Sequence, residues 1–165
     1  MSKTEVQTLL GAYESVRNLS KLYIGNLNKE KIHNQIEING IKFNSAYWIV
    51  THLVWTERFL IIQGIGGKDM DDHWLDEYGF GSNPEEVKTK PEFEEILKLF
   101  DDIHSKAVEV LKETNDNQLD EPNYINATFG GKSDKRTVLK HAIRHEPMHI
   151  GQISWILKLN KVEMV

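Results

Sequence analysis

The sequence predicts an all-α protein, a four-helix bundle, and three observations carry this prediction. Apolar residues recur at the three-four spacing of amphipathic helices in four long segments, no segment sustains the alternation of a β sheet, and connections rich in Gly, Pro and Asn separate the segments. The helices are expected at residues 3–27, at residues 44–63, from the Thr89–Glu92 capping box to Glu113, and at residues 134–160. With 165 residues, we treat 1–165 as a single domain with one sizeable core.

Composition excludes several function classes. The net charge of −5 and the lack of a basic run argue against a nucleic-acid partner. No apolar stretch approaches twenty residues and no leader precedes the first helix, so we expect a cytoplasmic protein without a membrane partner. The absence of cysteine excludes a thiolate nucleophile, a disulfide framework and Cys-ligated zinc. Any metal site must therefore use His, Asp, Glu or water.

Residues 28–43, after the first helix, lose the helical period. Gln35 to Ile38 alternates, Asn39-Gly40 follows, and Ile41 to Phe43 resumes the alternation. Asn-Gly between alternating segments is a strong hairpin signal, but two short strands are marginal alone. We expect a small β-hairpin, or an extended loop, between the first and second helices.

The second helix carries His52 in the middle of its inner stripe. The other side of this helix is also apolar, which allows two interpretations: further core, or a subunit contact. The residues that make this second side apolar are Tyr47, Val50, Val54 and Ile61.

A long irregular connection, Gly64 to Lys90, follows, and connections of this length are often binding elements or lids. Asp71, Asp72 and His73 in it are either additional ligands or solvated loop charge. In the third helix, His104 falls on the inner face, where it is a buried neutral histidine, a fourth ligand or a partner of a ligand.

Three histidines in the last helix, His141, His145 and His149, repeat every four residues and therefore share one face. A helical wheel adds further residues to this face, which we expect to point inward: Met148, Gln152, Trp155 and Ile156. The wheel places Glu57 and Glu146 off the inner faces, so neither is assigned as a general base. Pro147 is expected to kink or widen the helix between His145 and His149.

Bundles hold metal ions between facing helices, so His52, His145 and His149 are the predicted ligands of one divalent metal. Three imidazoles leave coordination positions open and do not choose strongly between zinc, nickel and iron. Such a site lowers the pKa of bound water, polarises a substrate oxygen or binds a substrate thiolate. Gln152 could hydrogen-bond a ligand imidazole, and His141 is either such a partner or a pocket wall.

Two segments resemble a known family. Trp48 to Phe59 reads WIVTHLVWTERF and Arg144 to Ile153 reads RHEPMHIGQI. Together they are similar to the DinB-like superfamily of damage-inducible and thiol-transferase-related proteins. The resemblance implies a four-helix bundle with one ligand on the second helix and two on the last, followed by Gly-Gln. These positions correspond to His52, His145, His149 and Gly151-Gln152. It also implies a divalent metal, often a homodimer, and thiol-dependent transferase, isomerase or hydrolase activity, in which a low-molecular-weight thiol would be a cosubstrate.

Three functional hypotheses follow. The first is a metal-dependent enzyme of the thiol-dependent transferase or hydrolase type acting on a small molecule. The second is a non-catalytic metal-binding or stress-related interaction protein that dimerises through the second helix. The third is a bundle with hydrogen-bonded buried histidines and no metal. Fold alone does not choose among them.

Overall fold

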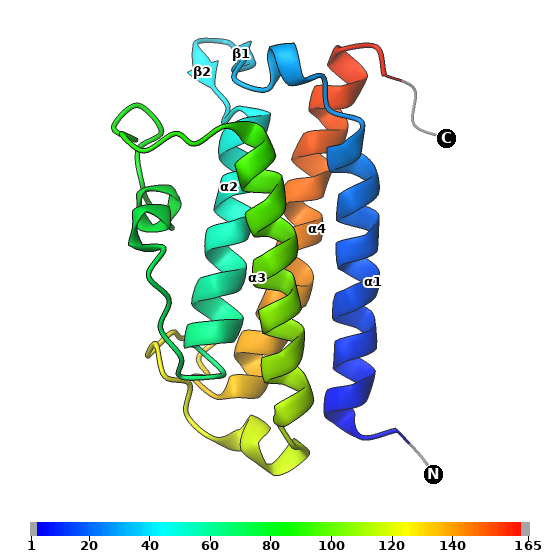
Figure 1. The fold of residues 1–165 in the computed structure, drawn as a ribbon, viewed down its shortest axis with the longest axis vertical. Helices are drawn as coiled ribbons and strands as arrows, with labels where there is room; N and C mark the ends of the chain where they lie inside the picture. Colours follow the sequence, from blue (N-terminus) through cyan, green and yellow to red (C-terminus); the bar gives the residue numbers. More distant parts are fainter. Residues whose placement is uncertain (1–2, 163–165) are drawn as a thin grey trace.

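The computed structural model describes residues 3–162 and consists of four long helices packed as a bundle (Figure 1). The helices are α1 Glu5–Gly25, α2 Ala46–Glu57, α3 Phe93–Glu113 and α4 Lys135–Leu159. The shorter elements are η1 Lys29–Lys31, β1 Glu37–Ile38, β2 Ile41–Lys42, η2 Arg58–Gln63, η3 His73–Tyr78 and η4 Asp116–Asp120. The all-α bundle expected from the sequence is confirmed.

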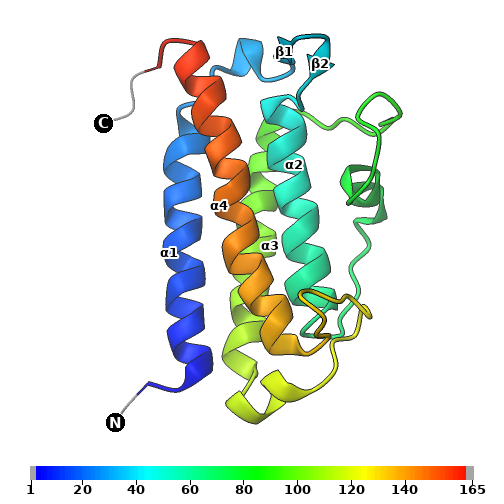
Figure 2. The same cartoon turned by 180° about the vertical axis from the view of Figure 1, so that it is seen from behind.

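The order of the helices explains the long connection in the middle of the chain. Helices α2 and α3 run in the same direction, so the segment between them returns along the outside of the bundle to its other end (Figures 1 and 2). Helix α1 packs mainly against α4, and α2 packs against both α3 and α4. A crossover connection of this kind is one of the standard ways to join helices in a bundle.

The small hairpin is confirmed, and its turn has the backbone that Asn-Gly favours. Strands β1 and β2 pair antiparallel, with Ile38 opposite Ile41. Asn39 and Gly40 have φ values of 52° and 77°, the left-handed conformation required at both central residues of a type I′ turn. Both strands are exposed, and the hairpin lies at one end of the bundle near the start of α2 (Figure 2).

Helix starts follow local capping chemistry, with one correction. Thr4 and Gln7 form a reciprocal capping box at α1, and Ser45 accepts from the Trp48 N–H at the start of α2. The capping box expected at Thr89 is wrong, because α3 begins only at Phe93. Thr89 instead donates its hydroxyl to the Glu77 carboxylate at 2.9 Å, which ties the end of the crossover to η3.

Helix α2 is buried on nearly every side. Tyr47, Val50, Val54 and Ile61, the apolar residues of its second side, are each at most 3% exposed within the single chain. These residues are further core, and the interpretation of them as a subunit contact is wrong. Beyond Glu57 the helix continues as the π-helical turn η2, whose wider backbone ends at Gln63. Among the described residues, no helix combines the length and apolar composition needed to cross a bilayer.

Candidate metal centre

The structure brings three of the predicted site residues together between α2 and α4. His52 comes from α2, and His145 and His149 lie one turn apart on α4; one ring nitrogen from each residue lies within 4.8 Å of the others. The Nε2 atoms of His145 and His149 are 3.2 Å apart. Two nitrogens bound to one tetrahedral zinc at about 2.0–2.1 Å lie roughly 3.3 Å apart. The three side chains could therefore hold a metal ion with small adjustments.

The ring of His52 is fixed by a hydrogen bond and by stacking. Its Nδ1 lies 2.6 Å from the carbonyl oxygen of Tyr78, the last residue of η3. A carbonyl only accepts, so the proton is on Nδ1 and the Nε2 lone pair is free for a metal. The indole of Trp48 stacks on the imidazole with centroids 4.8 Å apart. The crossover segment thus contributes to the site through a backbone carbonyl.

His149 is oriented in the same manner by a side chain. Its Nδ1 lies 2.8 Å from Oε1 of Gln152, so Nδ1–H donates to the amide oxygen and Nε2 faces the other histidines. Gln152 therefore contacts a predicted ligand, as the sequence indicated. The buried Nδ1 of His145 has no protein partner in the described part of the chain.

Burial keeps the three imidazoles in the form that binds metals. Desolvation lowers the pKa of His52 to about 4 and that of His145 to about 3, with a further lowering by the neighbouring histidines. Desolvation also lowers the pKa of His149, opposed by its hydrogen bond to Gln152. Neutral imidazole is the metal-binding form, so the cluster is ready to coordinate at neutral pH without releasing a proton.

Gln152→Leu is expected to weaken metal affinity by about 10–100-fold, because loss of a partner that orients a ligand imidazole typically has that effect. Competition titration with a chromophoric chelator measures the change. Gln35→Leu is the matched control, since Gln35 is exposed and far from α4 in the sequence. Equal affinities for the two variants would show that Gln152 does not orient His149.

His141 lies beside the cluster and lines a cavity. Its ring stacks on Phe129 with centroids 3.7 Å apart and planes 9° from parallel, and it lies 5.4 Å from the ring of His145. The cavity has a volume of about 240 Å³ and reaches both His52 and His145. We call it the aromatic cavity; its lining is His52, Trp55, Thr56, Phe59, Leu60, Phe80, Ala127, Thr128, Phe129, His141 and His145. Of the two roles predicted for His141, the pocket wall fits this position.

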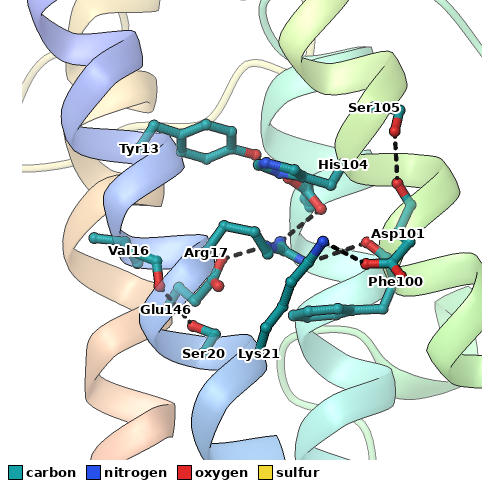
Figure 3. A network of polar contacts seen from close by, with 11 residues as sticks. Tyr13, Val16, Arg17, Ser20, Lys21, Phe100, Asp101, His104, Ser105 and Glu146 are labelled. Carbon is teal, nitrogen blue, oxygen red and sulfur yellow. Dashed lines mark hydrogen bonds and ion pairs between the residues drawn. The ribbon is translucent and has the colours of Figure 1, made fainter. Parts of the chain in front are cut away.

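His104 does not join the cluster, and the expectation that Glu57 and Glu146 lie off the inner faces is wrong. These three side chains belong to a buried polar network at the centre of the bundle. Figure 3 labels His104 and Glu146 of this network, with Tyr13 and Arg17 of α1. Arg17 of α1 places Nη2 2.6 Å from Glu57 and 3.0 Å from Glu146. The Nδ1 of His104 lies 2.7 Å from Glu57, and the Tyr13 hydroxyl donates to the same carboxylate.

The network is deeply buried and connects all four helices. Arg17 is 1% exposed, and its guanidinium also donates to the Phe100 carbonyl at 3.2 Å and lies 3.6 Å from the Phe100 ring centroid. Burial, reinforced by the Glu57 charge, raises the pKa of Tyr13 far above its usual value. Burial likewise raises the pKa of Glu146, opposed by Arg17. Neither carboxylate lines the aromatic cavity; both line a separate small cavity together with Thr56 and His145.

Part of the face assigned to the last helix points outward. Met148 and Trp155 are 66% and 71% exposed and Gln152 is exposed as well, so the expectation that these three point inward is wrong; Ile156 is buried as expected. The core face of α4 is rotated toward Ala142, Glu146, Ile150 and Ile153, and the histidines lie at its edge, toward α2. Helix α4 is continuous through Pro147, so the widened turn expected there is not found. Within residues 3–162 the widened, π-helical segment is η2, at the end of α2.

The loop residues weighed as additional ligands are solvated. Asp71 and His73 are exposed and Asp72 is half-buried. None of them belongs to a group of three that could hold a metal in the described residues. The contribution of the crossover lies instead in η3, where Asp76 accepts from the Trp55 indole N–H at 3.0 Å and also binds Arg58. The sequence gives little indication of these two contributions of η3. Every residue carries a backbone carbonyl like that of Tyr78, and acidic residues like Asp76 are common in loops.

Comparison with known families and proteins completes the description of the site. The sequence profile of the DinB superfamily matches residues 5–153, a range that includes α1 to α3, most of α4 and the histidine cluster. A search of curated proteins found no match. Because the profile covers most of the chain, this protein belongs to the DinB superfamily.

Proposed function

We propose that this protein is a metal-dependent enzyme of the thiol-dependent transferase or hydrolase type, acting on a small molecule. The observation that carries the proposal is the convergence of His52, His145 and His149 beside the aromatic cavity. A structural metal site usually has four protein ligands, whereas three ligands next to a cavity leave a position for a substrate. We also propose a cytoplasmic location, consistent with the lack of cysteine.

Each residue has a defined task in this proposal. The three imidazoles bind one divalent ion, with zinc, nickel and iron as candidates. Tyr78 and Gln152 hold His52 and His149 with Nε2 toward the ion. When bound, the metal supplies Lewis-acid chemistry, which activates water or a thiol at neutral pH or polarises a substrate oxygen.

The lining of the cavity favours an activation that depends on the metal. No aspartate or glutamate lines it. Thr56 contributes the hydroxyl nearest to His52, with Oγ1 3.4 Å from Nε2. Desolvation and the charge of Arg144 lower the pKa of His141, so this imidazole is neutral at pH 7. Its Nδ1 accepts from the Arg144 guanidinium at 3.0 Å, which leaves the proton on Nε2, so His141 is a donor in this arrangement and not a general base.

His52→Ala is expected to remove the bound metal, and elemental analysis of the purified protein tests this. The unsubstituted protein should hold about one ion per chain, and the variant should hold far less, because two imidazoles bind a divalent ion much more weakly than three. His73→Ala is the matched control, since His73 is exposed on the crossover. Full occupancy in His52→Ala would remove His52 from the site.

A turnover screen separates an enzyme from a non-catalytic metal-binding protein. Two panels should be screened with the metal found by elemental analysis: thiols together with electrophiles for transfer, and esters and amides for hydrolysis. Turnover that is lost on chelation and restored by the metal would support the enzyme. Full metal occupancy without turnover on either panel would favour the non-catalytic alternative.

A further inference from the structure

We infer that the aromatic cavity binds the flat, uncharged, apolar part of the substrate, a group about the size of one substituted ring. This inference rests on the proposed function, because the reacting part of the substrate must reach the metal. It adds a substrate class: small molecules that carry an uncharged, planar unsaturated group.

Two stacked pairs of rings form the walls. Trp55 of α2 and Phe59 of η2 stack with centroids 4.9 Å apart and planes 11° from parallel. Phe129, from the loop before α4, stacks on His141 of α4. Flat ligand groups bind well against such ring faces, in offset-stacked or edge-to-face geometry. Phe80, which is 95% exposed, is also part of the lining and would lose contact with water when a ligand binds.

Size and charge restrict the ligand. The cavity measures about 240 Å³, whereas an apolar cavity of about 150 Å³ suffices for benzene. No Lys, Arg, Asp or Glu lines it, and the polar groups present are two threonines and three histidines. A charged substituent placed there would lose its hydration without gaining an ionic partner, which is costly. A neutral ring loses little hydration and gains contacts.

The walls are held in place by residues outside the cavity. The side chain of Asn123, which is 5% exposed, accepts from the Ala127 N–H at 3.0 Å and donates to the Ala127 carbonyl at 2.8 Å. These bonds fix the loop that carries Thr128 and Phe129. In the other stacked pair, the indole N–H of Trp55 donates to the Asp76 carboxylate at 3.0 Å, which fixes that ring. A preformed pocket avoids the cost of ordering its walls when the ligand binds.

A second concavity provides the competing location. An apolar groove of about 470 Å³ lies between the hairpin and the end of α4 and includes Phe43, Gln152 and Trp155. We call it the Trp155 groove; its lining is Ile36, Ile38, Lys42, Phe43, Asn44, Ile49, Gln152, Trp155, Ile156 and Leu159. It is larger, but none of the three clustered histidines lines it, whereas His52 and His145 line the aromatic cavity. A ligand that contacts the metal is therefore placed in the cavity.

Hydroxamates test the inference because they combine a metal-binding group with a chosen substituent. Calorimetric titration of the protein reconstituted with one equivalent of zinc would compare acetohydroxamate, benzohydroxamate and 4-carboxybenzohydroxamate. Benzohydroxamate is expected to bind at least about tenfold more tightly than acetohydroxamate, because the buried phenyl ring adds apolar area. The carboxylated ring should lose most of this advantage.

Two variants locate the ring. Phe129→Ala should lower the preference for benzohydroxamate several-fold and leave acetohydroxamate binding unchanged. Phe43→Ala is the matched control, since Phe43 is a half-exposed phenylalanine of the Trp155 groove. Melting curves of both variants confirm that they are folded. The reverse result, with an effect of Phe43→Ala alone, would overturn the inference by placing the ring in the groove.

The remaining outcomes separate this inference from the proposed function. If the zinc-loaded protein binds all three hydroxamates equally, the open metal site stands and the inference about the cavity is wrong. If it binds zinc but no hydroxamate, the open coordination position is wrong, and the proposed function falls together with the inference.

Discussion

Arg17→Met is expected to destabilise the fold by about 3–5 kcal/mol, the usual result of removing one partner of a buried ion pair. For a chain of this size the loss corresponds to a decrease in melting temperature of about 6–20 °C. The physical reason is that Glu57 and Glu146, 4% and 6% exposed, would lose their shared cation without gaining water. Thermal unfolding followed by circular dichroism measures the change.

The control for this prediction is Arg136→Met. Arg136 also pairs with two carboxylates, Glu5 and Asp120, but these lie at the surface, with side chains 39% and 71% exposed. Exposed pairs contribute little, so the control should melt close to the unsubstituted protein. If both arginine variants melt at the same temperature, the buried network does not hold the helices together.

Removing the two carboxylates as well should restore part of the loss. In Arg17→Met combined with Glu57→Gln and Glu146→Gln, no uncompensated charge stays buried, and only hydrogen-bond mismatches remain. We expect the triple variant to melt between the wild-type protein and Arg17→Met. A triple variant less stable than the single one would show that packing around the arginine stem, in place of charge, causes the loss.

Metal binding is expected to stabilise the fold strongly at neutral pH. At a free metal concentration of about 1,000 times the dissociation constant, the folded state gains about 4 kcal/mol, or about 8–16 °C in melting temperature. Melting curves with metal and with excess chelator at pH 7.5 measure this. His149→Ala should melt at the same temperature in both conditions. A metal-induced increase that persists in His149→Ala would place the ion elsewhere.

The same histidines make the metal-free protein sensitive to acid. In the folded chain the pKa of His52 is lowered to about 4 and that of His145 to about 3, both from 6.5. Between pH 6.5 and these values the unfolded chain binds protons that the folded chain does not, so the free energy of unfolding decreases as the pH falls. The contribution of the neutral histidines to the free energy of unfolding should be fully present above pH 6.5. Chelator-treated protein melted at pH 7.5 and pH 5 should reveal the decrease, and identical stability would contradict the burial of these rings.

The histidine cluster was accessible from sequence because helical spacing can be counted. One histidine in the middle of a predicted helix and two a turn apart on another are enough to suggest a shared site. The orientation of Met148 and Trp155 was not accessible. A helical wheel gives the angle of each side chain around one helix axis. Which of these angles are buried depends on the elements that pack on either side of the helix. Although Trp155 shares a groove with residues of the hairpin, it is 71% exposed.

The central network escaped sequence analysis for a related reason. The helical wheel places Glu57 and Glu146 off the inner faces, in agreement with the usual exposure of glutamate. The cation that allows their burial is Arg17, which is 40 residues from the first and 129 from the second along the chain. Likewise the partner of His52 is the backbone of Tyr78, a group that every residue carries. Such pairings arise only from the tertiary arrangement.

The separation of the ligands along the chain has a consequence for the unfolded state. His52 and His145 are 93 positions apart, and the helices that carry them meet only in the folded bundle. An ion bound by both would close a long loop, and the entropy that a cross-link removes from an unfolded chain increases with loop length. The sequence has no cysteine and therefore no disulfide. The bound ion would serve as a reversible cross-link between the two halves of the chain, formed only when the metal is supplied.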